Sequence, residues 1–153
     1  MLLLVWALSR FSPWGRSGGS VRELAFVVAE RSNLVAVIDL DRLVVAASIP
    51  VSRAPVAARA CPVRNEVYVA TRAGRLEVID AAQLRHAGSV AVAGSPLRLE
   101  LSEDGHRAYV LSRVQPAVHV VDLRARRVLD SIPLPPRSEP VALKLAPGGR
   151  LLG

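Results

Sequence analysis

The chain has 153 residues and a mean hydropathy of +0.32, which suits one ordinary domain and excludes a largely disordered protein. Its net charge is +7, but most of the basic residues are scattered singly and aromatic residues make up only 4%. A nucleic-acid binder concentrates its cations and offers aromatic rings for base stacking. We therefore expect an evenly basic, solvated surface and no nucleic-acid partner.

The N-terminal region differs in composition from the rest of the chain. Residues 1–8 are almost wholly apolar, and a Pro-, Gly- and Ser-rich stretch continues to residue 20. No Lys or Arg precedes the apolar run, as a secretory signal requires, and the run is too short to span a bilayer. We predict that residues 1–20 form a leader or linker, whether a clipped signal peptide, an upstream remnant or a spurious start. No later segment approaches the roughly 18 apolar residues of a membrane span.

From residue 21 onward the chain repeats itself about every 41 residues. Asp39, Asp80 and Asp122 are spaced 41 and 42 apart, and each ends a run of apolar strand, short polar break and apolar strand. A period of this size indicates supersecondary units that bury their apolar faces only by stacking on one another. The units cover about residues 24–65, 66–105 and 106–149 of a repeat domain that spans 21–153.

Each unit is predicted to contain strands, because its apolar residues alternate with period two rather than 3.6. Leu97, Leu99 and Leu101, for example, share one face of a strand that follows a recurring proline. Asn33 and Gly74 occupy the same break between two strands, and both suit a left-handed turn. The predicted first strands span 56–61, 97–102 and 141–146, the second 25–29, 66–70 and 107–111, the third 34–39, 75–80 and 118–122, and the fourth 44–51, 88–93 and 128–134.

Four antiparallel strands in about 41 residues describe one blade of a β-propeller. The first unit lacks a predicted first strand, and a fourth unit is represented only by the strand after Pro140 and a stub. A closed propeller typically needs 4–8 blades. We therefore predict an all-β fold, a partial, open β-propeller of about three four-stranded antiparallel blades. The missing blades are expected in a longer chain, in a separate gene product or in further copies of the protomer.

The recurring acidic and aromatic residues are the first candidates for chemistry. Acid–base catalysis needs carboxylates that converge on one pocket, whereas Asp39, Asp80 and Asp122 lie one blade apart. Each ends a strand before a turn, where a carboxylate accepts backbone N–H groups. We predict a structural role for all three, and a packing role for Tyr68 and Tyr109, which also share a repeat position.

The other reactive side chains show no catalytic or metal-binding pattern. Cys61 is the single cysteine, and we expect it to be a small buried hydrophobe. His86, His106 and His119 occupy three different repeat positions, with no Cys or carboxylate at ligand spacing. The sequence has no Gly-rich phosphate loop, no Gly-x-Ser-x-Gly elbow and no haem-attachment cysteine pair. We predict no catalytic residue, no metal site and no cofactor.

One recurring set of cations allows two interpretations. Arg31, Arg72 and Arg113 are spaced 41 and 41 apart, each just after a predicted second strand. Equivalent positions on successive blades would form an arc of guanidinium groups along one rim, which could bind an anionic ligand or partner. The alternative is a set of loop charges that only contact water.

Several segments together resemble the YVTN family β-propeller repeat. The matching segments are residues 66–71 (EVYVAT), 76–80 (LEVID), 95–96 (SP) and 101–105 (LSEDG), and the third unit repeats the pattern at 108–112 and 120–122. The resemblance covers about residues 24–150. The chain departs from the family pattern at Arg31, Arg72 and Arg113, where the motif often has Asn.

The resemblance implies a function as well as a fold. We predict a non-enzymatic scaffold or binding module, a fragment of a longer YVTN-like propeller, with its loops facing a protein or glycan partner. The resemblance implies an extracytoplasmic site. An alternative is a fragment of a propeller enzyme, since similar propellers include lactonase-like hydrolases and the haem-d1-bearing domain of nitrite reductases. The catalytic and cofactor-binding residues of those enzymes have no match in this chain. An Arg, Glu and His cluster at the channel mouth would favour the enzyme.

Overall fold

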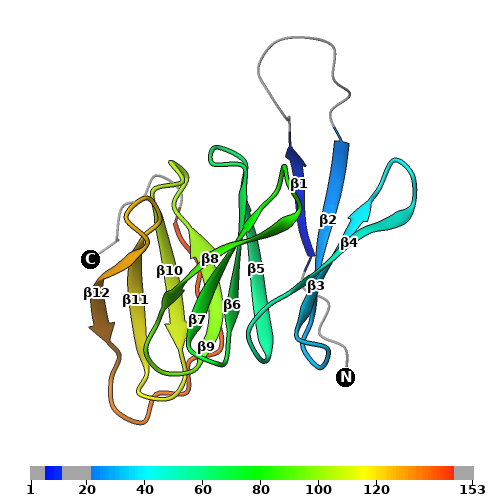
Figure 1. Cartoon of the computed structure of the whole chain (residues 1–153). Coiled ribbons are helices and arrows are strands. Elements are labelled where there is room, and N and C mark those ends of the chain that lie inside the picture. The colour runs from blue at the N-terminus through cyan, green and yellow to red at the C-terminus, as the bar shows by residue number, and fades with distance from the viewer. Residues whose placement is uncertain (1–5, 12–21, 147–153) are drawn as a thin grey trace.

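The fold is an open all-β propeller, as predicted. The computed structural model describes the strand at residues 6–11 and, with side chains, residues 22–146. This part of the chain forms three antiparallel sheets of four strands each, with strand orders β1-β2-β3-β4, β5-β6-β7-β8 and β9-β10-β11-β12 (Figure 1). We call these sheets blades 1, 2 and 3.

The strand boundaries follow the repeat. Blade 1 consists of β1 (Trp6–Phe11), β2 (Arg22–Ala29), β3 (Leu34–Asp39) and β4 (Val44–Pro50). Blade 2 consists of β5 (Pro55–Cys61), β6 (Glu66–Thr71), β7 (Arg75–Asp80) and β8 (Arg85–Ala91). Blade 3 consists of β9 (Pro96–Leu101), β10 (Arg107–Ser112), β11 (Ala117–Asp122) and β12 (Arg127–Pro133).

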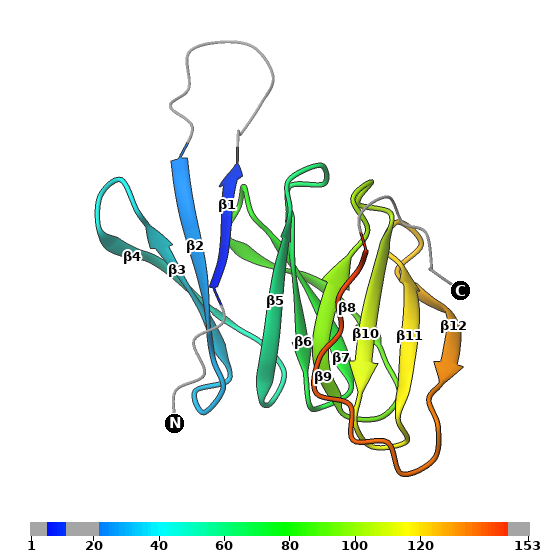
Figure 2. The ribbon, with the colours of Figure 1, turned by 180° about the vertical axis from the view of Figure 1, so that it is seen from behind.

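The blades stand side by side with their first strands at a common inner edge. β1 contacts β5, and β5 contacts β9, whereas the last strands β4, β8 and β12 lie further out (Figures 1 and 2). The turns that join second to third strands lie at the lower end of the blades in Figure 1, together with the linkers 51–54 and 92–95. We call this end the lower rim.

Blade 1 contains one strand more than the sequence analysis predicted. Trp6–Phe11, in the expected leader, forms β1 and pairs antiparallel with β2, from Trp6 opposite Val27 to Phe11 opposite Arg22. This pairing satisfies backbone N–H and C=O groups that an unpaired β2 would leave free along the inner edge. The rest of the predicted leader, residues 1–5 and 12–20, lies outside the described residues.

The strand predicted at 141–146 is not present. These residues have no regular structure, although they lie beside β9, where Lys144 Nζ is 2.8 Å from Glu100 Oε1 (Figure 2). A strand exists only by hydrogen bonding to a neighbour. In a blade the first strand pairs with the second strand of the same blade, and the described residues contain no second strand of a fourth blade. The prediction was wrong because the pattern supplies the strand's side chains but not its partner.

The register of blade 1 is offset by one residue from the simple 41-residue spacing. The aspartates that end the third strands pair with equivalent residues of the second strands, which are Leu24, Glu66 and Arg107. Leu24 and Glu66 are 42 apart, not 41. Phe26 is therefore the structural equivalent of Tyr68 and Tyr109, and each blade carries an aromatic ring at this position.

The core lies between blades rather than within one. Phe26, Val28 and Val37 of blade 1 pack on Val67 and Val69 of blade 2, and all five are at most 2% exposed. We call the face of a blade that points to the next blade in the chain its forward face, and the opposite face its backward face. The forward face of blade 2 packs in the same way on the backward face of blade 3. Each such side chain stabilises the fold by about 1.5–3 kcal/mol when fully buried.

The recurring aspartates close turns, as predicted. In each blade one carboxylate oxygen accepts the backbone N–H groups two and three residues further along, at 2.8–3.1 Å, and the carboxylates belong to Asp39, Asp80 and Asp122. The left-handed prediction for Asn33 and Gly74 is also confirmed, with φ of 53° and 78°. Tyr68 is 1% exposed and packs in the core, and Cys61 is a buried free thiol whose pKa is raised by burial.

Candidate functional site

The three arginines singled out from the sequence all lie exposed at the lower rim. Arg31 lies in the β2–β3 turn, Arg72 in the β6–β7 turn and Arg113 in the β10–β11 turn. Two of them are structurally equivalent, because Arg72 N donates to Ala54 O at 2.9 Å and Arg113 N donates to Ser95 O at 3.0 Å. The rim therefore presents guanidinium groups from three neighbouring blades.

In blade 1 the arginine lies one residue further along the turn than in blades 2 and 3. Glu30 directly follows β2, as Arg72 directly follows β6, so the structural equivalent of Arg72 is Glu30 rather than Arg31. Glu30 Oε1 is 2.8 Å from Arg72 Nη1. This partly exposed pair neutralises part of the arc and joins blade 1 to blade 2. The sequence spacing of Arg31 and Arg72 is a regular 41 residues, so this one-residue offset can be recognised only from the strand register.

A fourth cation of this rim was not predicted from the sequence. Arg53 is exposed in the linker between β4 and β5, at the same end of the blades as the turns that carry Arg31 and Arg72. It has no equivalent arginine in the linker 92–95, which reads Val-Ala-Gly-Ser. Arg53 does not recur in the repeat, so the repeat pattern does not predict it.

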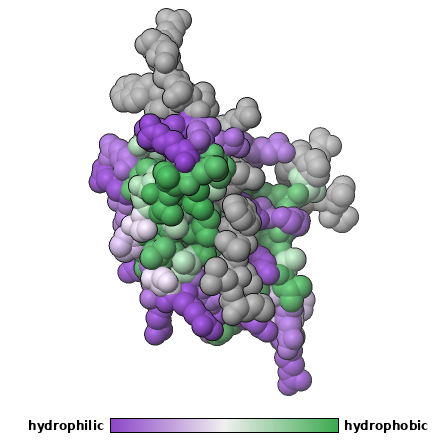
Figure 3. Space-filling view, turned by 90° about the vertical axis from the view of Figure 1, so that its right-hand side faces the viewer, coloured by the Kyte–Doolittle hydropathy of each residue, from purple (hydrophilic) through white to green (hydrophobic). Residues whose placement is uncertain are grey.

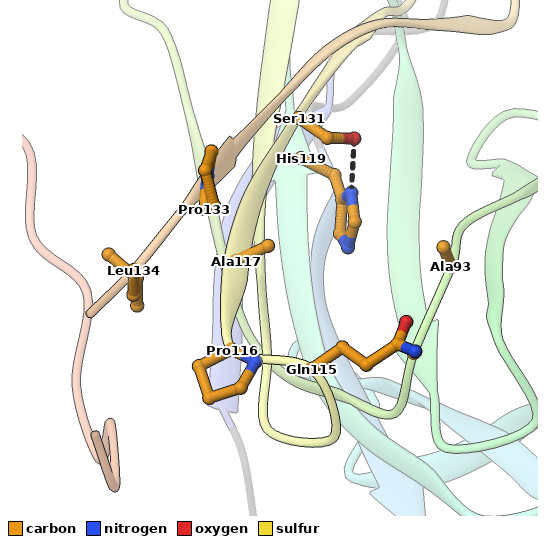
Figure 4. A pocket seen from close by; sticks show the side chains of 9 residues that line it. Ala93, Gln115, Pro116, Ala117, His119, Ser131, Pro133 and Leu134 are labelled. Atoms are coloured by element: carbon orange, nitrogen blue, oxygen red, sulfur yellow. Dashed lines mark hydrogen bonds between the residues drawn. The ribbon is translucent and has the colours of Figure 1, made fainter. Parts of the chain in front are cut away.

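A pocket of about 460 Å³ opens at the lower rim beside blade 3 (Figure 4). It lies between the linker that precedes β9, the β10–β11 turn and the lower parts of β11 and β12. Its lining is mainly apolar and consists of Ala93, Gly94, Gln115, Pro116, Ala117, His119, Ser131, Pro133 and Leu134.

His119 supplies the buried polar group of this pocket. The side chain is 4% exposed, and its Nδ1 lies 2.7 Å from Ser131 Oγ (Figure 4). Within the described residues Nε2 has no hydrogen-bond partner. Burial lowers the pKa of His119 below the ordinary 6.5, although the Ala93 backbone opposes this shift. The imidazole is therefore neutral at neutral pH, with one nitrogen toward the linker before β9.

The equivalent position in blade 2 explains what this residue does. Glu77 and His119 are paired with Ser89 and Ser131, so they occupy the same place in their blades. Glu77 is 2% exposed, and its Oε1 accepts the backbone N–H of Ser52, in the linker before β5, at 3.3 Å. A buried polar side chain at this position therefore faces the incoming linker in both blades, which is a structural role.

The inner edge carries a row of charges from successive blades. Arg59, Glu100 and Lys144 each lie four residues after a recurring proline. Arg59 donates through Nε and Nη2 to the two oxygens of Glu100 at 3.2 and 3.0 Å, and Lys144 donates to Oε1 at 2.8 Å. Arg59 and Glu100 also line a pocket of about 290 Å³ between β5 and β9.

The inner-edge row connects neighbouring first strands and is poorly suited to proton transfer. Burial raises the pKa of Glu100, but hydrogen bonds from Arg59 and Lys144 outweigh burial and hold the pKa below the ordinary 4.5. A carboxylate that stays ionised at neutral pH and has both oxygens engaged is a weak acid–base catalyst. The lining of this pocket includes Arg and Glu but no His.

The described part of the chain contains no group of three or more metal-ligating side chains. In the same residues no helix is long and apolar enough to cross a membrane. His86 and His106 do not approach His119, since His86 contacts Glu77 at 2.7 Å and His106 lies in the turn between β9 and β10 at the opposite rim. The structure thus keeps the three histidines apart.

Comparison with solved structures identifies the fold. The chain superposes on hydrazine synthase of Kuenenia stuttgartiensis with a TM-score of 0.70 at 22% identity, over 72% of this chain and 34% of that one. For apo AztD from Citrobacter koseri the TM-score is 0.63 at 20% identity, over 76% and 33% of the two chains. For the dihydro-heme d1 dehydrogenase NirN in complex with DHE it is 0.67 at 18% identity, over 79% and 27%.

These neighbours are β-propeller proteins, and at 18–22% identity the likeness shows the fold alone. The chain spans 34, 33 and 27% of their lengths, respectively. No family model matches the sequence, and no curated protein matches it.

Proposed function

We propose that this chain is part of a larger YVTN-like β-propeller that acts as a non-enzymatic scaffold and binds an acidic partner through its lower rim. The observation that carries the proposal is the exposure of Arg31, Arg72 and Arg113 on neighbouring turns at one end of the blades. Guanidinium groups on rigid turns recognise carboxylate and sulfate groups through paired hydrogen bonds. The partner is accordingly an acidic glycan or the acidic surface of a protein.

The roles of the other carboxylates support a scaffold. The recurring aspartates bind backbone N–H groups, Glu77 faces a linker, and Glu100 connects two inner strands. The alternative of a propeller-enzyme fragment, lactonase-like or haem-d1-type, draws support only from the names of two structural neighbours. Identities of 18 and 22% do not extend those activities to this chain.

Immobilised heparin is a suitable probe for an acidic glycan. Replacing Arg31, Arg72 and Arg113 with Gln is expected to lower the salt concentration at which the chain elutes, because rim charges attract the polyanion. A matched control replaces Arg42, Arg85 and Arg124, which are exposed toward the opposite rim, with Gln. Equal elution of the two triple variants would contradict the rim proposal. Immobilised poly-glutamate, used in the same way, tests the acidic protein.

We further propose an extracytoplasmic location, which the YVTN resemblance supports. Fractionation of cells that express the full-length gene, with an epitope tag at the C-terminus of the protein, is expected to place it in the periplasmic or extracellular fraction. Recovery in the cytoplasmic fraction alone would contradict this location.

A further inference from the structure

The backward face of blade 1 is apolar, and within the described residues no blade packs on it. In Figure 3, which shows the molecule from that side, hydrophobic residues gather over blade 1. The strand register assigns Val27, Leu34, Ala36, Ile38 and Val45 to this face, and Val45 is 64% exposed. An apolar patch of this kind on a soluble protein marks an interaction surface.

Two of these positions, those of Val27 and Ile38, are fully buried wherever a neighbouring blade is present. Val69 and Ile79 of blade 2 are the equivalents of Val27 and Ile38, and both are 0% exposed because they pack on the forward face of blade 1. In blade 3 the equivalent Val121 is also 0% exposed. The uncovered face of blade 1 thus continues the established interface between blades.

The forward face that would complete this interface is also present on the chain. Blade 3 carries Tyr109, Val118, Val120 and Ile132 on its forward face, at the positions that Tyr68, Leu76, Val78 and Val90 occupy in blade 2. Val90 is 5% exposed against blade 3, whereas Ile132 is 48% exposed. The forward face of blade 3 therefore presents the same kinds of side chain, an aromatic ring and branched aliphatic groups, that pack on a backward face elsewhere in the fold.

We propose that a second copy of this chain covers both faces, with blade 3 of each copy packed on blade 1 of the other. The contact joins two different surfaces, so it is heterologous, and two such contacts around a two-fold axis close a ring. Two copies of three blades give six blades, within the 4–8 of closed propellers. The inference rests on the proposal that the chain is part of a larger ring, and it names the source of the missing blades.

The segment 141–146 must make room for the second copy. It lies beside β9, where an incoming blade brings its own first strand, β1. Its ion pair with Glu100 involves Lys144, whose side chain is 78% exposed. Exposed pairs of this type contribute little stability, so the segment is readily displaced.

The test is the mass of the full 153-residue chain in solution, measured by sedimentation equilibrium. The wild type is expected at twice the chain mass of 16.4 kDa. Ile38→Asp and Ile132→Asp, one on each proposed face, are each expected to sediment at the single-chain mass, because their equivalents Ile79 and Val90 are at most 5% exposed and a carboxylate buried there is unpaired. Val63→Asp and Val114→Asp are matched controls, since both residues are exposed in turns, and they are expected to stay dimeric.

Mixing the two monomeric variants identifies the contact. A dimer of one I38D chain and one I132D chain has one junction free of either substitution, so the mixture is expected to recover dimer that neither variant forms alone. Far-UV circular dichroism shows whether each variant is folded. A monomeric wild type, an I132D variant that stays dimeric, or a mixture without dimer would overturn the proposal. The heparin test compares variants that differ in rim charge and share the same blade faces, so the rim proposal can fail or stand separately.

Discussion

At the scale of single residues, most buried polar groups of this chain serve the backbone. Asp39 is 2% exposed, and its Oδ1 accepts the N–H groups of Asp41 and Arg42 at 3.1 and 2.9 Å. The turn ends with Leu43 at φ 57°, a left-handed conformation that a β-branched residue would strain. The hydrogen bonds of Asp39 thus stabilise a turn that contains a non-glycine residue in the unfavourable left-handed conformation.

Replacing Asp39 with Ala is expected to lower the free energy of unfolding by about 1–2 kcal/mol, because two N–H groups lose their acceptor. Asp39→Asn keeps an acceptor oxygen and is expected to lose less. Urea denaturation followed by circular dichroism measures both. An Ala variant as stable as the wild type would show that water replaces the carboxylate without cost.

The buried imidazole of His119 makes stability depend on pH. Since its pKa is lowered in the fold, the unfolded chain binds a proton more readily than the folded chain. Stability is therefore full above the ordinary pKa of 6.5 and falls as the pH drops through 6.5 toward the lower folded value. His119→Gln is expected to reduce the fall in melting temperature between neutral and mildly acidic pH. An unchanged pH profile in this variant would contradict the assignment.

At the scale of elements, the blades are held together by side chains that cross from one sheet to the next. The Arg126 guanidinium, in the turn between β11 and β12, donates to Ala87 O at 2.7 Å and to Glu66 Oε1 at 3.2 Å. Glu66 also accepts from Arg64 and from the hydroxyl of Tyr68. This cluster joins blade 2 to blade 3 at the rim opposite the arginine arc.

The absence of a side chain at Gly88 leaves room for the Arg126 guanidinium between blades 2 and 3. The φ of Gly88 is +138°, and a Cβ there would lie 2.8 Å from Arg126 Nη1. Gly88→Ala is expected to cost about 1–2 kcal/mol of stability, from backbone strain together with displacement of the arginine. In an Arg126→Ala background the displaced group is absent, so the same substitution is expected to cost less. A double-mutant cycle by urea denaturation measures the difference, and equal costs in both backgrounds would contradict the contact.

The first strands are connected by Glu100. Its folded pKa is lowered, so it contributes stability above the unfolded value, and that contribution is lost as the pH falls through the folded pKa. Arg59→Gln removes the bidentate one of the two cations that lower the pKa of Glu100. The pKa of Glu100 is therefore expected to rise, and acid unfolding is expected at a higher pH. Lys144→Gln is expected to act more weakly, because Lys144 is 78% exposed. Carbon-13 NMR titration of the carboxyl group measures the shift, and a larger effect from Lys144 would contradict the geometry.

The elements also show how far sequence reasoning reaches in this chain. Alternation and the recurring Asp predict the second, third and fourth strands, because those features act within one strand and its turn. β1 was missed because its residues lie far before the place that the 41-residue period assigns to a first strand. The segment 141–146 has strand chemistry but no partner, and pairing is a non-local property. His119 and Ser131 meet only through the β11–β12 register.

At the scale of the whole molecule, the part of the chain that the structure describes forms three blades with two buried junctions and leaves two blade faces without a neighbouring blade. Blade 2 alone is packed between two others, with Tyr68 and Val78 buried on its forward face and Val69 and Ile79 on its backward face. Blades 1 and 3 each have one such junction. The open propeller is therefore most strongly stabilised in its middle, and its outer blades depend on what covers them.

Amide hydrogen exchange of the Ile38→Asp variant, followed by NMR, tests the open three-blade fold most directly. The amides of β6 and β7 are expected to exchange most slowly, because blade 2 is covered on both faces. Those of β4 and β12, at the outer edges of blades 1 and 3, are expected to exchange faster. If β6 and β7 exchanged as fast as the linkers 51–54 and 92–95, the three-blade fold would be contradicted.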